Sequence, residues 1–290
     1  MRFSRVSILV LISLTVLIGT NCSYYNRVLA RKHLVDGADA YKERKFQQAE
    51  ELFRLAAASD PENKTIESKT ARLFLARTLH SEYIGNRQKQ ELAEDAIAEY
   101  KKVLAVDIKD QSSYKAIANL LENLGKQDEW QQWVTERTNN EQVPPEQRAE
   151  ALTSLAAKQY SCANEISDVE PVKKTVIKAG IPEYQFSKPQ DPKEFEQLKQ
   201  CADKGLELIT KAVQLDPNSD SVWSYNANLL VQKGRVAEME GNTAEQEKLK
   251  AEAQKAKDKF SELAELKRKK EEEQLAMQKA KEEEANSKKK

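Results

Sequence analysis

The sequence predicts an all-α fold in which pairs of helices repeat along the chain. Only eight Gly and eight Pro occur in 290 residues, while charged residues make up 32%. Sheets use Gly, Pro and Asn in their many turns, whereas long amphipathic helices need few such residues. Helical periodicity dominates from Arg27 onward, and three segments of the chain share one pattern.

The first 22 residues have the layout of an export signal. Arg2 and Arg5 precede a mostly apolar run over residues 6–19, which is shorter than the ~20 residues that span a bilayer. Cys22 follows this run directly, as in a bacterial lipoprotein signal, which the segment resembles. The resemblance implies that Cys22 is lipidated and becomes the mature N-terminus. An uncleaved signal-anchor or an ordinary cleavage site are the alternatives, and all three place the rest of the chain outside the cytoplasm.

Three later segments repeat one arrangement of small, large and acidic residues. A small residue is followed four positions later by a large apolar residue, three later by a small or medium one, and four later by Asp. This spacing predicts one buried helix stripe followed by a helix stop. The three sets are Ala49-Phe53-Ala56-Asp60, Ala96-Tyr100-Val103-Asp107 and Gly205-Ile209-Ala212-Asp216.

These residues resemble the tetratricopeptide repeat, a helix-turn-helix unit of about 34 residues. The first repeat matches the family pattern at Gly37, Ala49, Phe53, Ala56 and Pro61. Trp223, Ala227 and Leu230 match the start of the last repeat, and three further first helices read as 73–79, 114–121 and 145–162. The resemblance implies a solenoid of about five repeats, some of them degenerate, over residues 27–266. A generic helical bundle is the alternative.

Two regions fall outside the repeats. An insertion at 163–192 contains four prolines and is expected to be irregular or extended. After Gly241, Thr243 is the expected N-cap of a long charged helix of coiled-coil composition. Residues 267–290 form a charged tail, helical or disordered, because Leu275 and Met277 are its only larger apolar residues.

The two cysteines of the exported body flank the insertion. In the repeat register, Cys162 falls at the end of a first helix and Cys201 at the start of the second, so the two are expected to face each other. A disulfide there would pin the neck of the insertion, contributing ~4 kcal/mol in the chain-entropy model. Two buried free thiols are the alternative. No metal site or cofactor is expected, since there is no Cys-x-x-Cys and His33 and His80 are remote in sequence.

No catalytic motif occurs, and 47 Lys and Arg against 47 Asp and Glu disfavour a nucleic-acid binder. The predicted function is a non-enzymatic scaffold, held at the bacterial cell envelope and facing the periplasm, that binds protein or peptide partners. By analogy with lipoprotein sorting, Ser23 favours the outer membrane. The alternatives are an envelope spacer and an accessory in outer-membrane assembly. The tetratricopeptide resemblance implies partner contacts in the groove at Tyr41, Lys42, Arg77, His80, Lys115, Asn119, Tyr160 and Asn228.

Overall fold

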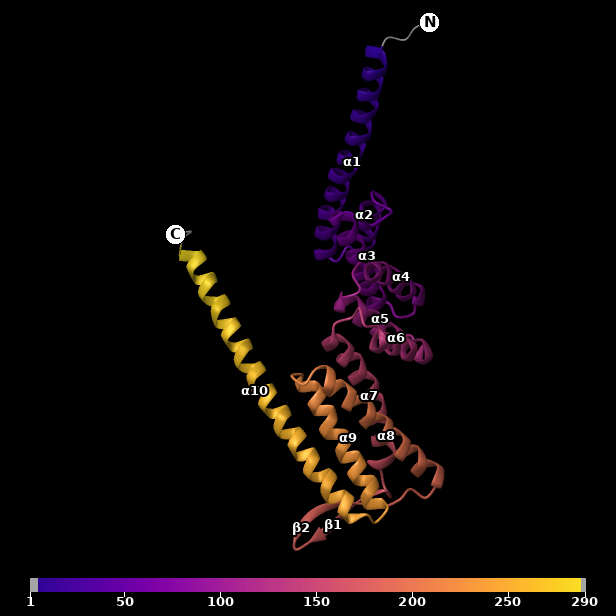
Figure 1. Cartoon of the computed structure of the whole chain (residues 1–290), viewed down its shortest axis with the longest axis vertical. Coiled ribbons are helices and arrows are strands. Elements are labelled where there is room, and N and C mark those ends of the chain that lie inside the picture. The colour runs from indigo at the N-terminus through magenta and orange to yellow at the C-terminus, as the bar shows by residue number, and fades with distance from the viewer. Residues whose placement is uncertain (1–4, 288–290) are drawn as a thin grey trace. The chain divides into compact units, whose positions relative to one another are not determined.

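The computed structural model describes residues 5–287, with side chains from Tyr24 to Glu284 except that of Lys178. The fold of these residues is an all-α helical repeat with one short hairpin (Figure 1). The elements are α1 Arg5–Lys42, α2 Phe46–Ala58, α3 Ile66–Gly85, α4 Gln90–Val106, α5 Gln111–Asn123, α6 Gln127–Asn139, α7 Pro145–Ser167, β1 Lys173–Lys178, β2 Ile181–Phe186, α8 Pro192–Leu215, α9 Asp220–Met239 and α10 Thr243–Ser287.

The chain divides into two compact units, Met1–Trp130 and Gln131–Lys290, which are described separately. Cys22, the cysteine proposed for lipidation, is one of the residues of α1. Its side chain is not among those that the structure describes. Among the residues that the structure describes, no helix combines the length and the apolar character that a membrane crossing requires.

The first unit packs its helices in the predicted repeat register. Ala49, Phe53 and Ala56 of α2 are all 0% exposed. Phe53 lies directly against Gly37 of α1, where an added Cβ would stand 2.8 Å from the ring. The ring of Phe53 also stacks on Phe74 of α3, with centroids 5.5 Å apart. The small residues therefore let α1 and α2 approach closely, and the aromatic residue fills the space behind them.

The second unit repeats this arrangement with α7, α8 and α9. Ile209 and Ala212 of α8 are 0% exposed, as the pattern predicted. Gly205 is packed so closely that an added Cβ would lie 2.5 Å from Leu229 of α9. The next helix, α10, packs along α9 through Leu249, Ala253 and Ala256.

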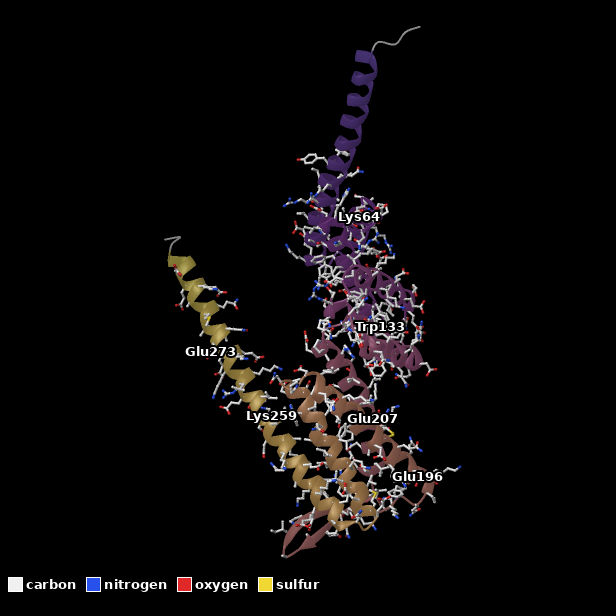
Figure 2. All side chains as sticks on the ribbon, in the orientation of Figure 1. Lys64, Trp133, Glu196, Glu207, Lys259 and Glu273 are labelled. Carbon is white, nitrogen blue, oxygen red and sulfur yellow. A yellow bond between two sulfur atoms is a disulfide. The ribbon has the colours of Figure 1, made fainter. Side chains whose placement is uncertain are left out.

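The last part of α10 extends beyond the region in which α10 packs against α9. Figure 2 shows the side chains around Glu273 with no other element of their unit beside them, and Leu275 and Met277 are exposed there. The helix therefore continues through the predicted tail as far as Ser287. The predicted cap is wrong by one residue: the Asn242 side chain, not Thr243, accepts a hydrogen bond from the Glu245 backbone at 3.2 Å.

The insertion contains a β-hairpin, which is the extended alternative of the expectation, and its first residues belong to α7. Lys178 pairs with Ile181 across a two-residue turn in which Ala179 and Gly180 both have positive φ, 49° and 81°. A two-residue turn with positive φ at both positions has a backbone twist that matches the right-handed twist of the strands. The hairpin is attached to α9 through Phe186, whose ring lies 4.4 Å from the guanidinium of Arg235 and whose backbone N–H donates to Glu238.

The structure pairs Cys162 with Cys201 in a disulfide, with the Cα atoms 6.1 Å apart. The expected location at facing helix ends is wrong, since both residues lie inside helices. α7 continues to Ser167, and α8 begins at Pro192 with the Asp191 side chain as its N-cap. The two helices are therefore longer than a standard repeat allows, and the non-helical part of the insertion begins after Ser167.

Candidate partner-binding groove

One face of α3 carries a stripe of side chains that are not part of the core. The stripe consists of Ile66, Thr70, Leu73, Arg77, His80 and Ile84. These positions alternate in steps of four and three, so they lie along one side of the helix. Ile66 and Ile84 are 72% and 57% exposed, while Ala71, Leu75 and Leu79 on the other side are buried. The α3 stripe therefore presents apolar and basic groups away from the core.

Arg77 and the predicted groove residue Tyr41 both lie against Phe74 of α3. The guanidinium carbon of Arg77 lies 5.6 Å from the ring centroid of Phe74. The ring of Tyr41, from α1, approaches Phe74 edge-on at 6.3 Å, and its hydroxyl lies 3.1 Å from the Ser81 hydroxyl. Aromatic rings and arginine fixed in this way are the residue types that most often anchor protein partners.

His80 lies beside Tyr100 of α4, with the rings edge-on at 6.1 Å. Burial raises the pKa of Tyr100 to about 12. Burial also lowers the pKa of His80 below its usual 6.5, and the nearby positive charge of Arg87 lowers it further. The lowered pKa favours the neutral form of His80, and Arg77 supplies the positive charge at this point of the stripe.

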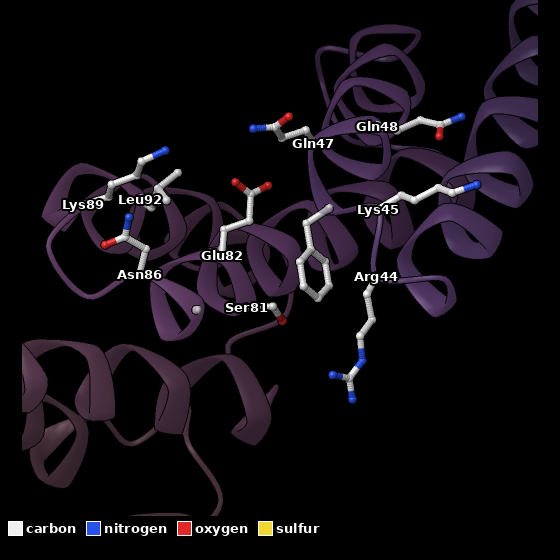
Figure 3. Close-up of a pocket in the computed structure, with 11 residues that line it drawn as sticks. Arg44, Lys45, Gln47, Gln48, Ser81, Glu82, Asn86, Lys89 and Leu92 are labelled. Atoms are coloured by element: carbon white, nitrogen blue, oxygen red, sulfur yellow. The ribbon is translucent and has the colours of Figure 1, made fainter.

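A cavity of about 530 Å³ lies at the C-terminal end of α3 (Figure 3). It is lined by the α1–α2 turn, the first turn of α2, the end of α3 and the start of α4. Figure 3 shows Glu82 in the middle of the lining group. Burial and the neighbouring Glu50 raise the pKa of Glu82, and its Oε1 is buried without a hydrogen-bond donor. The basic side chains Arg44, Lys45 and Lys89 line the same cavity.

The other predicted groove residues have contacts or exposure of their own in each of the two units. Lys42 is exposed and pairs with Asp39. Lys115 is exposed on α5, where Asn119 accepts a hydrogen bond from Asn123 at 2.8 Å. In the second unit, Tyr160 packs edge-on against Tyr225 with centroids 6.2 Å apart, and Asn228 is half-buried on α9.

The repeat register missed several residues of this region. Phe74, Ser81 and Glu82 were not predicted, although they adjoin Arg77 and His80 on the same helix. Ile66, Leu73 and Ile84 fall on one side of a helix, and this helical spacing was the signal that could have identified the stripe. Among the described residues, no group of three or more His, Cys, Asp or Glu side chains could hold a metal ion.

No protein-family model matches the sequence, and no curated protein does. Solved structures of helical repeat proteins do match. PilF of Pseudomonas aeruginosa is 16% identical over 84% of this chain and 92% of its own, with a TM-score of 0.40. A tetratricopeptide repeat protein of Parabacteroides merdae is 12% identical over 82% and 98%, with a TM-score of 0.34. A tetratricopeptide repeat protein of Thermus thermophilus is 16% identical over 81% and 98%, with a TM-score of 0.28.

Proposed function

We propose that this protein is a non-enzymatic interaction scaffold, tethered at the bacterial envelope, that binds a segment of a partner protein along the α3 stripe. The observation that supports this function is the stripe itself. It combines two exposed isoleucines with Arg77 and the half-buried aromatic group around it. A row of apolar, aromatic and arginine side chains outside the core is the kind of surface that commonly binds a partner.

The dimensions of the stripe suit a short segment of a partner. Ile66 and Ile84 are 18 residues apart, which places them about 27 Å apart along the helix axis at 1.5 Å per residue. An extended segment of about eight residues covers that length. The cavity that Glu82 lines at one end of α3 provides room for a side chain of the segment.

Photocrosslinking tests the binding face. A photoreactive phenylalanine analogue at Ile84 is expected to capture one partner in intact cells. The same analogue at Leu55 of α2 is the matched control, since the two side chains are 57% and 52% exposed. Mass spectrometry of the adduct identifies the partner segment. Equal capture at both positions would show that the α3 stripe has no special role.

Affinity measurements then test the role of Arg77. A synthetic peptide of the captured segment is expected to bind the Arg77→Ala variant about tenfold more weakly, as for a typical interface anchor. Arg54→Ala is the control, because Arg54 is an exposed arginine of α2 that pairs with Glu50. Unchanged affinity in Arg77→Ala would contradict the proposed binding face.

Tethering is proposed from the lipoprotein-like order of basic residues, apolar run and Cys22. Cys22→Ser is expected to abolish labelling of the chain by a fatty-acid analogue and to slow or block its maturation. Full labelling of the variant would remove the lipid anchor from the proposal. The scaffold function would then be tested by the crosslinking alone.

A spacer function is the second candidate. The observation that favours it is the length of α10, whose 45 residues extend about 68 Å at 1.5 Å per residue. Covalent attachment of the C-terminal lysines to the cell wall would support the spacer, and a specific partner at Ile84 would support the scaffold.

A further inference from the structure

A second cavity, of about 190 Å³, lies at the N-terminal end of the α3 stripe. It is formed where two successive turns between repeats come together, the α2–α3 turn and the α4–α5 turn. Its volume is several times the roughly 30 Å³ that a water molecule takes up in the liquid. Its lining residues are Asn63, Lys69, Thr70, Leu73, Val103, Val106, Asp107 and Asp110.

Asn63 supplies a buried hydrogen-bond acceptor without a donor. The residue is only 8% exposed, and its side-chain oxygen has no hydrogen-bond partner in the structure. Its backbone is held in the left-handed region, with φ 57°, and its N–H donates to the Asp60 carbonyl. Buried acceptors are almost always paired in folded proteins. Asn63 is among the residues that line the cavity, and its unpaired oxygen is an acceptor that a bound donor would satisfy.

Two carboxylates of the α4–α5 turn, Asp107 and Asp110, line the same cavity as Asn63. Asp107 accepts from the Lys109 backbone at 3.0 Å, and Asp110 caps α5 by accepting from the Ser113 backbone at 2.7 Å. Burial alone would raise the pKa of Asp110, but the hydrogen bonds from Ser113 and Ser112 and the charge of Arg77 together lower it. These hydrogen bonds go to one oxygen of each carboxylate. An ionised carboxylate can accept about four hydrogen bonds, so each carboxylate can accept more from a bound group.

The remaining wall of the cavity is mostly apolar. Leu73 comes from the α3 stripe, and Val103 and Val106 come from the last turns of α4, with Val106 46% exposed. Lys69 is the one basic residue in the lining and is exposed. The lining thus combines apolar side chains with carboxylate and amide acceptors, which suits a side chain with an aliphatic stem and a cationic head.

We propose that this cavity binds an arginine side chain of the partner segment, with its stem on Leu73 and the two valines and its guanidinium on Asn63, Asp107 and Asp110. Arginine fits better than lysine because its planar fork offers five donors to several acceptors at once. The inference rests on the proposed function, since it assigns one residue of the segment that lies along the α3 stripe.

The test uses blocked arginine, N-acetyl-arginine methylamide, as the probe and the full chain in detergent as the receptor. Titration followed by NMR is expected to give saturable shifts of amides in residues 63–73 and 103–110. Blocked citrulline has nearly the same shape without the charge and is expected to bind at least about tenfold more weakly. Equal binding of citrulline or of blocked lysine, or no saturable shift, would overturn the arginine site.

Asp107→Asn is the informative variant, because asparagine keeps an acceptor for the Lys109 N–H and removes the charge. It is expected to weaken arginine binding about tenfold. Asp216→Asn is the matched control, since Asp216 ends α8 in the same way and accepts from the Asn218 backbone at 3.1 Å. An equal loss in both variants would contradict the proposal.

A second variant changes a residue outside the α4–α5 turn, so its effect does not depend on whether Asp107→Asn alters the conformation of that turn. Lys69→Met removes the competing positive charge from the lining and is expected to strengthen arginine binding severalfold. Weaker binding in that variant would also contradict the site. Failure of the arginine site leaves capture at Ile84 and the effect of Arg77→Ala unchanged, whereas failure of the scaffold function removes both of those results.

Discussion

Replacing both Cys162 and Cys201 by alanine is expected to lower the free energy of unfolding of the second unit by about 4 kcal/mol. The disulfide joins residues with a sequence separation of 39, and closing a loop of that length removes much conformational freedom from the unfolded chain. Both residues also pack against the cluster that contains Phe195, Leu198 and Val236. Alanine keeps the site apolar, so the loss reports mainly the covalent link.

Native-state hydrogen exchange measures this effect unit by unit. Amides of α7 and α8 are expected to exchange faster in the double alanine variant, while amides of α2 and α3, in the other unit, keep their rates. Reduction of the wild-type protein is the matched treatment. Free alkylation of both thiols in protein purified from the envelope without reductant would contradict the disulfide itself.

The packing of the repeats could be predicted from the sequence because it depends on local spacing. Ala49, Phe53 and Ala56 fall on one side of a helix at steps of four and three, and only a small residue allows a neighbouring backbone to come close. The same reasoning located Ile209 and Ala212 in the core. It also predicted the pairing of Cys162 with Cys201, although it located both at helix ends and the structure has both inside helices.

The hairpin could not be predicted with the same rules. Val176, Ile177 and Tyr184 favour strands, but Pro182 lies within the second strand and argues against one. What holds the hairpin in place is distant in the sequence. The Arg235 guanidinium donates to the Ser167 hydroxyl at 3.0 Å and stacks on Phe186. Gln232, 1% exposed, accepts from the same hydroxyl.

The candidate site was predicted only in its middle part. The repeat register located Tyr41, Arg77 and His80, which the structure brings close together with Phe74 and Tyr100. The two cavities at the ends of α3 were missed because each needs turns from different repeats to meet. Asn63 reads in the sequence as an ordinary turn residue, and only the structure shows that its side-chain oxygen is buried without a partner.

Phe53→Ala is expected to destabilise the first unit by about 3–5 kcal/mol, the usual cost of removing a buried aromatic ring. The ring is 0% exposed and contacts both Gly37 and Phe74. Native-state exchange of α2 and α3 amides gives the loss directly. A loss below about 1 kcal/mol would mean that Phe53 is not the residue that fills this part of the core.

Gly37→Ala tests the same contact from the other side. The new Cβ would lie 2.8 Å from the Phe53 ring, so overpacking of about 1–3 kcal/mol is expected to exceed the gain of up to about 1 kcal/mol from better helix propensity. In a Phe53→Leu background the conflict disappears, and Gly37→Ala becomes neutral or stabilising. Gly234→Ala is the control, because the nearest atom is 3.9 Å away and only the propensity gain remains. If Gly37→Ala has the same effect in both backgrounds, the glycine is not required for the close approach of α1 and α2.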